Sequence, residues 1–221
     1  MIENRVSTAQ RTRQPFWGWS DLALLAVGML LLIVSLYQIV LHFGLSAAAA
    51  GAITEVPGPL GILYLILRLR YKRSPWTALG WVPPRRPLDW AIAAAGGAAL
   101  GLLIMALENP TRFQIHFHSS AEALIQGVFF AGLVEETIWR GAILPVILRH
   151  TKPFMAALLT GIVFALYHGV YRRQLPPLSA LLSITLTGTM YGLLRIRSQS
   201  TLTAALMHGC YNLTLFFWQG A

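Results

Sequence analysis

The chain has 221 residues, of which 56% are hydrophobic and only 11% charged, against roughly 25% charged residues in an average soluble domain. A soluble fold could not bury this much apolar surface, so the composition predicts a protein embedded in a lipid bilayer. The net charge of +9 does not indicate nucleic-acid binding, because the basic residues lie between long apolar runs. The single cysteine, Cys210, excludes a disulfide framework and a cysteine-rich zinc module.

Apolar runs long enough to cross the ~30 Å hydrocarbon core of a bilayer occur along the whole chain. They predict seven transmembrane helices, at Leu22–Gly44, Ala47–Leu67, Trp90–Leu107, Ala121–Leu148, Phe154–Val170, Leu178–Leu194 and Leu202–Trp218. Glu55 and Pro57 interrupt the second run, which we expect to be broken or to start late. Gly141 and Pro145 could bend or end the fourth. The expected fold is an all-α, polytopic membrane helix bundle.

Basic residues in the connecting loops predict the orientation of this bundle. With the N-terminus in the cytoplasm (N-in), most of the 17 Lys and Arg residues fall in cytoplasmic loops. One membrane domain is expected, with a cytoplasmic segment at 1–20, N-terminal transmembrane helices at 21–120 and helices with polar motifs at 121–221. Small residues predict close helix packing, at Gly97 and Gly101 and again at Gly188 and Gly192. The expected location is a membrane crossed several times, the cell membrane if the host is a bacterium.

Ionisable side chains within a predicted span cost at least ~2.5–3.5 kcal/mol, so they indicate a partner or a function. The fourth run contains Glu135, Glu136 and Arg140. Glu136 and Arg140 are four residues apart on one helix face, which predicts an ion pair. A structural role and a direct catalytic role remain open for Glu136. Glu135 has no such neighbour, and a desolvated carboxylate without a partner is suited to act as a general base.

Two later spans each contain a histidine one helical turn from another side chain. The fifth run has Phe164 and His168, and the seventh has His208 and Asn212. A single histidine in a helix is more often a packing residue than a catalyst. Together with the glutamates, however, these residues offer a base, a second proton-handling group and neutral donors for a developing oxyanion. Those are the functional groups of a hydrolase.

The motifs Glu-Glu-x-x-x-Arg, Phe-x-x-x-His and His-x-x-x-Asn, in this order and in separate late spans, resemble the CPBP family of intramembrane proteases. That family includes the type II CAAX prenyl endopeptidases and bacteriocin-processing, self-immunity and abortive-infection-related proteins. The resemblance covers about Ala121–Trp218. It implies an intramembrane endopeptidase that hydrolyses peptide bonds of membrane-associated or CAAX-like substrates.

The resemblance also implies a role for each motif residue. Glu135 would activate a water, assisted by His168, for attack on a peptide carbonyl. His208 and Asn212 would donate hydrogen bonds to the oxyanion. Residues expected to support the site are Glu136, Arg140 and Phe164. Trp139 stands where members of the family often have phenylalanine.

Metal dependence is a separate question, because the family is often described as metalloproteases. Glu135, His168 and His208 could supply three zinc ligands with an open fourth position. The His-Glu-x-x-His zinc signature is absent, however, and a carboxylate–imidazole pair can activate water without a metal. We therefore expect a glutamate-type mechanism with no cofactor, and zinc remains the alternative.

Other classes of membrane protein also carry polar residues within their spans. A rhomboid-type serine protease would need a Gly-x-Ser-x-Gly run, which the chain lacks. A transporter could use the same polar residues as a proton path, but no repeated half with paired broken helices is evident. A non-catalytic immunity or binding protein of the same fold stays open. His116 and His118 fall in a predicted outer loop, where a surface location is favoured over a metal site.

Overall fold

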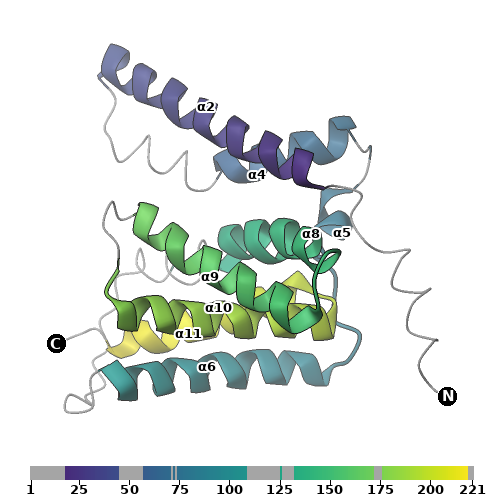
Figure 1. The fold of residues 1–221 in the computed structure, drawn as a ribbon, viewed down its shortest axis with the longest axis vertical. Coiled ribbons are helices and arrows are strands. Elements are labelled where there is room, and N and C mark those ends of the chain that lie inside the picture. Colours follow the sequence, from purple (N-terminus) through teal and green to yellow (C-terminus); the bar gives the residue numbers. More distant parts are fainter. Residues whose placement is uncertain are drawn as a thin grey trace. The chain divides into compact units, whose positions relative to one another are not determined.

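The computed structural model describes residues 18–44, 57–70, 72, 74–108, 125, 132–171 and 176–218. The predicted all-α class is confirmed, because these residues form helices and connecting turns and include no β-strand. The chain divides into two units, Met1–Leu79 and Gly80–Ala221 (Figure 1). Most of segment 1–20, the pair His116 and His118, and most of 109–131 lie outside the described residues.

In the described residues, the first unit has two longer helices and two short helical turns. They are α2 (Trp19–Phe43), α4 (Pro57–Leu65), the π-helical turn η1 (Ile66–Arg70) and α5 (Pro75–Ala78). At the start of α2, the Gly18 N–H donates a hydrogen bond to Asp21 Oδ2 at 2.8 Å, which caps the helix. The helix ends at Gly44, whose φ of 64° lies in the left-handed region. The described part of the second predicted run begins with α4 at Pro57, and residues 47–56 of that run lie outside the described residues.

The second unit contains the remaining helices. They are α6 (Leu88–Glu108), the π-helical η3 (Thr137–Ile143), α8 (Leu144–Leu148), α9 (Pro153–Tyr171), α10 (Leu178–Ser198) and α11 (Thr201–Trp218). α9 packs along α10, α6 packs along α11, and α10 contacts α11 (Figure 1). Pro145 is accommodated in the first turn of α8, so it does not interrupt the hydrogen bonding of a helix interior.

The predicted packing glycines of the second unit lie at close contacts between helices. A Cβ added at Gly97 on α6 would lie 2.2 Å from the carbonyl oxygen of Met207 on α11. One added at Gly188 on α10 would lie 3.1 Å from Gly161 Cα on α9. The other two glycines make similar approaches, Gly101 to Thr214 and Gly192 to Ala157. The predicted role of these glycines in helix packing is confirmed.

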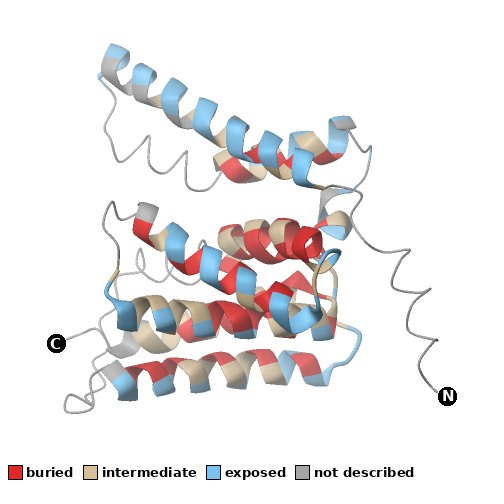
Figure 2. Cartoon of the chain, viewed as in Figure 1, coloured by how far each residue is buried: buried red, intermediate tan, exposed pale blue. Residues whose placement is uncertain are grey.

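The core of the second unit joins α6, α10 and α11. Its buried side chains are Ala93, Ile104, Tyr191, Leu194, Ala204, Met207 and Tyr211. Figure 2 shows buried residues on these helices and on α8, whereas α2 of the first unit is mostly exposed. An exposed, apolar α2 is the pattern of a helix that faces lipid rather than water.

Two of the described helices are long and apolar enough to cross a membrane, within Trp19–Leu36 and Leu88–Leu107. Two shorter apolar helices cover Gly58–Leu69 and Pro153–Gly169. α10 and α11 are less apolar because both contain several threonines, α10 has Arg195 and Arg197 in its last turn, and α11 contains His208. The helices therefore coincide with predicted spans in sequence, while the seven-span, N-in topology stays a prediction.

Candidate active site

The two adjacent glutamates lie where the backbone departs from a regular α-helix. Glu136 immediately precedes η3, and residues 132–135 also have π-helical geometry. Such turns insert an extra residue into a helix and occur frequently at functional sites. Glu136 is fully buried, whereas the side chain of Glu135 is 29% exposed. Neighbouring carboxylates are thus placed in different surroundings.

Arg140 and Glu136 form the ion pair expected from their spacing. Arg140 Nη1 donates to Glu136 Oε1 at 2.8 Å, and both side chains are fully buried. Arg140 Nη2 donates to the carbonyl oxygen of Gly188 on α10, also at 2.8 Å. The guanidinium carbon lies 4.8 Å from the ring centre of Phe164 and 5.1 Å from that of Tyr191. The positive charge of Arg140 is compensated by a carboxylate, a carbonyl and two aromatic faces. Through these contacts the Arg140 side chain connects η3 with α9 and α10.

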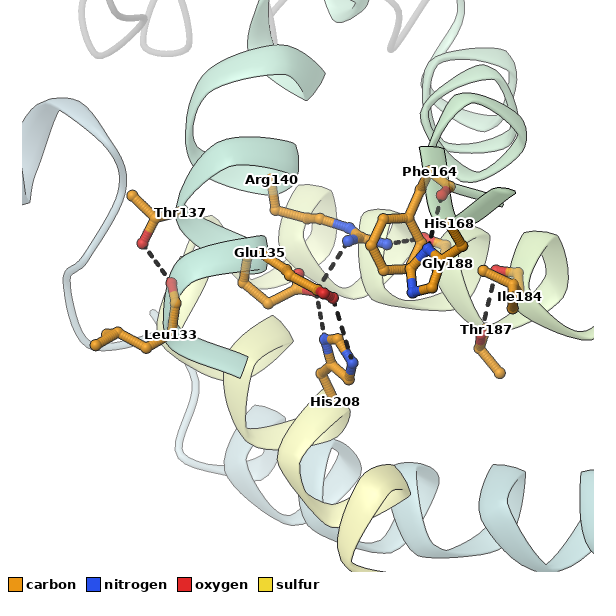
Figure 3. Close-up of polar contacts among 11 residues, drawn as sticks. Leu133, Glu135, Thr137, Arg140, Phe164, His168, Ile184, Thr187, Gly188 and His208 are labelled. Carbon is orange, nitrogen blue, oxygen red and sulfur yellow. Dashed lines mark hydrogen bonds and ion pairs between the residues drawn. The ribbon is translucent and has the colours of Figure 1, made fainter. Parts of the chain in front are cut away.

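His208 directs one ring nitrogen to each of the two glutamates, and Figure 3 shows its imidazole facing Glu135. Its Nδ1 is 2.9 Å from Glu136 Oε1, and its Nε2 is 3.9 Å from Glu135 Oε2. Because an ionised carboxylate can only accept, Nδ1 carries the proton and donates to Glu136. The Tyr191 ring stacks on the imidazole with centroids 4.8 Å apart and an interplanar angle of 22°. Glu136 and Tyr191 together fix the ring plane and direct Nε2 toward Glu135.

His168 is oriented by its own helix. Its Nδ1–H donates to the carbonyl oxygen of Phe164 at 2.9 Å, which leaves Nε2 as the acceptor of the neutral ring. The Phe164 ring meets the His168 ring edge-on at 4.6 Å and the His208 ring edge-on at 6.1 Å. His168 therefore adjoins the cluster through Phe164 (Figure 3), and its Nε2 is the nitrogen able to take a proton.

The remaining motif positions border this cluster. Asn212 is one helical turn beyond His208 on α11 and is partly buried. Trp139 is buried and packs edge-on against Phe164 at 5.5 Å and against Tyr167 at 5.6 Å. The larger ring at position 139 thus forms part of the wall beside Phe164.

The structure brings together six of the seven residues singled out from the sequence, and it adds two from α10. Those in mutual or shared contact are Glu135, Glu136, Arg140, Phe164, His168 and His208. Sequence reasoning did not select Tyr191 and gave Gly188 only a packing role, because the predicted sixth span contains no Asp, Glu, His, Lys or Arg. The sequence feature that could have indicated Tyr191 is the spacing of Gly188 and Gly192, which places that tyrosine on a closely packed helix.

The same side chains include the three candidate zinc ligands. The described part of the chain contains no group of three or more His, Cys, Asp or Glu side chains that could hold a metal ion. His208 directs Nδ1 to Glu136 and Nε2 toward Glu135, and His168 Nδ1 bonds to a carbonyl. These hydrogen bonds occupy Nδ1 of both histidines and leave Nε2 as the nitrogen that would bind a metal. Zinc held by Glu135, His168 and His208 remains the alternative, and no step below uses it.

Comparison with known proteins agrees with the motifs. Residues 117–214 match the family model described as type II CAAX prenyl endopeptidase Rce1-like. No curated protein and no solved structure shows significant similarity to the chain. The matched range contains all three motifs, which confirms the resemblance, and it leaves residues 1–116 outside.

Proposed function

We propose that this chain, whose residues 117–214 match the type II CAAX prenyl endopeptidase Rce1-like family model, hydrolyses peptide bonds of membrane-associated substrates. One observation carries the proposal. Glu135 is partly exposed, while the adjacent Glu136 is fully buried and already accepts hydrogen bonds from Arg140 and His208. Only Glu135 is therefore placed to meet a water and a substrate.

The proposed first step is attack of a water on the peptide carbonyl carbon. Glu135 accepts a proton from that water as the new carbon–oxygen bond forms. His168 assists through Nε2, the basic nitrogen left by its hydrogen bond to the Phe164 carbonyl. Glu136 contributes indirectly, because its negative charge balances Arg140 and orients His208.

The tetrahedral oxyanion then needs hydrogen-bond donors. His208 in its doubly protonated form would donate Nδ1–H to Glu136 and Nε2–H to the oxyanion. The side-chain amide of Asn212, one turn away, is proposed as the second donor. When the intermediate collapses, the carbon–nitrogen bond breaks and the proton held by Glu135 passes to the leaving amine. The acid product retains the oxygen of the water.

The proposed substrates are peptide segments anchored in or next to a bilayer, including CAAX-like C-termini. Support comes from the apolar outer faces of the helices that surround the site. On α9 and α10 the large exposed apolar side chains are Phe154, Met155, Leu159, Ile162, Val163, Leu166, Leu178, Leu182, Leu186 and Met190. Faces of this kind suit lipid rather than water, so a substrate would reach the site from within or beside the membrane.

The test uses purified protein in detergent and a mixed library of prenylated and unprenylated peptides. Wild type and Glu135→Gln are incubated with the library, with and without a chelator, and products are identified by mass spectrometry. Cleavage by wild type alone, unaffected by chelator, is expected, and the cleaved peptides identify the substrate class. Chelator sensitivity would replace the metal-free mechanism with the zinc alternative. Absence of cleavage by a folded wild type would overturn the proposal and favour a binding or immunity function.

A further inference from the structure

The segment before α6 contains three consecutive residues, Gly80, Trp81 and Val82, that contact the helices on which the candidate site residues lie. We call these residues the strap. They precede the family match at 117–214, so nothing in the motifs assigns them a role. Trp81 reaches the glutamate-bearing turn, whereas Gly80 and Val82 are bound at the junction of α10 and α11.

The contact of Trp81 with the first motif is a single long-range hydrogen bond. The indole N–H of Trp81 donates to Thr137 Oγ1 at 3.0 Å, and the Thr137 hydroxyl donates to the Leu133 carbonyl at 2.6 Å. Thr137 is buried and directly follows Glu136. Because an indole nitrogen can only donate, this chain of hydrogen bonds has one direction, from Trp81 through Thr137 to Leu133. It spans the backbone turn that holds both glutamates.

The other two strap residues are fixed to the start of α11. The backbone N–H of Thr201 donates to the Gly80 carbonyl at 2.7 Å, and the Ser200 hydroxyl donates to the Val82 carbonyl at 2.5 Å. Ser200 and Thr201 are fully buried. Gly80 has a φ of 75°, and a Cβ there would lie 2.3 Å from Arg195 Nη2. The strap conformation is therefore determined by the α10–α11 junction.

The two attachments have a common consequence for the site. α11 carries His208, and the turn held by Trp81 carries Glu135 and Glu136. The strap thus connects the backbone turn that carries Glu135 and Glu136 with α11, the helix that carries His208. The two carboxylates and the imidazole are aligned by a 2.9 Å hydrogen bond from His208 Nδ1 to Glu136 and by a 3.9 Å approach of His208 Nε2 to Glu135.

We infer that Trp81 is a positioning residue of the proposed peptidase, whose indole N–H holds residues 133–137 so that Glu135 and Glu136 face His208. The inference rests on the proposed function for its effect on rate. A displacement of catalytic groups by about 1 Å can lower a rate by about 10²-fold. Loss of this partly buried hydrogen bond at the edge of the site is expected to produce part of that effect.

The test is a double-mutant cycle on Trp81 and Thr137. Trp81→Phe keeps an aromatic ring and removes the donor, and Thr137→Val keeps the shape and removes the acceptor. Each single variant is expected to lower kcat about tenfold with KM little changed, and the double variant should be no slower than either. Thr137→Ser, which retains the hydroxyl, should keep most of the wild-type rate. Trp90→Phe, at an exposed tryptophan of α6, is the matched control.

A purely structural role would give a different pattern. Lower thermal stability with wild-type kcat in the folded fraction, or losses that multiply in the double variant, would overturn the inference. A second measurement is independent of catalysis: the imidazole ¹⁵N signals of His208, assigned with a His208→Asn variant. Trp81→Phe should shift these signals and Trp90→Phe should not. Unchanged His208 signals in folded Trp81→Phe would overturn the positioning role even if wild type proved not to cleave peptides.

Discussion

At the residue scale, one carboxylate is used for structure and its neighbour is left accessible. Glu136 accepts from both Arg140 and His208 and has no exposed surface. Removal of one partner from a buried ion pair leaves an uncompensated charge, which typically costs ~3–5 kcal/mol. Glu135 lies 3.9 Å from His208 Nε2 and retains partial exposure.

We predict that Glu136→Ala and Arg140→Ala each lower the free energy of unfolding, whereas Glu135→Ala abolishes cleavage and leaves the fold stable. Chemical unfolding of the purified variants in one detergent measures the stability, and the peptide assay measures the activity. Equal loss of folded protein in all three variants would contradict this division between the two glutamates.

Tyr191 gives a second prediction at this scale, because its ring stacks on His208 and also faces Arg140. Such ring contacts contribute about 1 kcal/mol beyond the area they bury. Tyr191→Leu should therefore reduce kcat/KM by several-fold or more, while Tyr191→Phe, which keeps the ring, should retain most of it. If both variants lost activity to the same extent, the hydroxyl rather than the ring would be the functional group.

At the element scale, the site depends on backbones that approach closely. Gly97 lets α6 lie against α11, the helix that carries His208. Alanine is normally favoured over glycine within a helix by ~0.5–1 kcal/mol. At Gly97 the new Cβ would lie 2.2 Å from the Met207 carbonyl oxygen, so overlap with a backbone atom outweighs that gain.

We predict that Gly97→Ala lowers the free energy of unfolding by ~1–3 kcal/mol, the usual range for overpacking. Gly61→Ala on α4 is the control, because no atom lies within 4 Å of a Cβ at that position. It should be neutral or slightly stabilising. Equal unfolding midpoints for Gly97→Ala and wild type would mean that α6 and α11 separate without cost.

The helices and their polar motifs could be predicted because both follow from local patterns. Apolar run length indicated where the helices lie, and a four-residue spacing indicated the pairs Glu136 with Arg140 and Phe164 with His168. The π-helical turn and the link from Glu136 to His208 could not be predicted, since they depend on contacts between distant segments. A tryptophan at position 81 carries no pattern that would connect it with Thr137.

At the scale of the whole molecule, orientation in the membrane decides which side can supply water and substrate. The predicted N-in topology places the loop between α8 and α9 in the cytoplasm. Lys152 in that loop is exposed. Since Cys210 is the only cysteine, a Cys210→Ser background permits site-specific labelling.

We predict that Lys152→Cys in this background is protected from a membrane-impermeant maleimide in intact cells and is labelled once the membrane is opened. Labelling in intact cells would contradict the N-in topology. A cysteine introduced at Phe43, the exposed last residue of α2, should show the opposite pattern and controls for access of the reagent.

The most direct test of the central claim is the initial rate of cleavage of one substrate peptide by wild type and Glu135→Gln in the same lipid. The substitution preserves the size of the side chain and removes its ability to take a proton. If Glu135 is the general base, the rate should fall by ~10²–10⁴-fold with the unfolding midpoint unchanged. A rate within a few-fold of wild type would show that another group activates the water, and the mechanism built on Glu135 would be wrong.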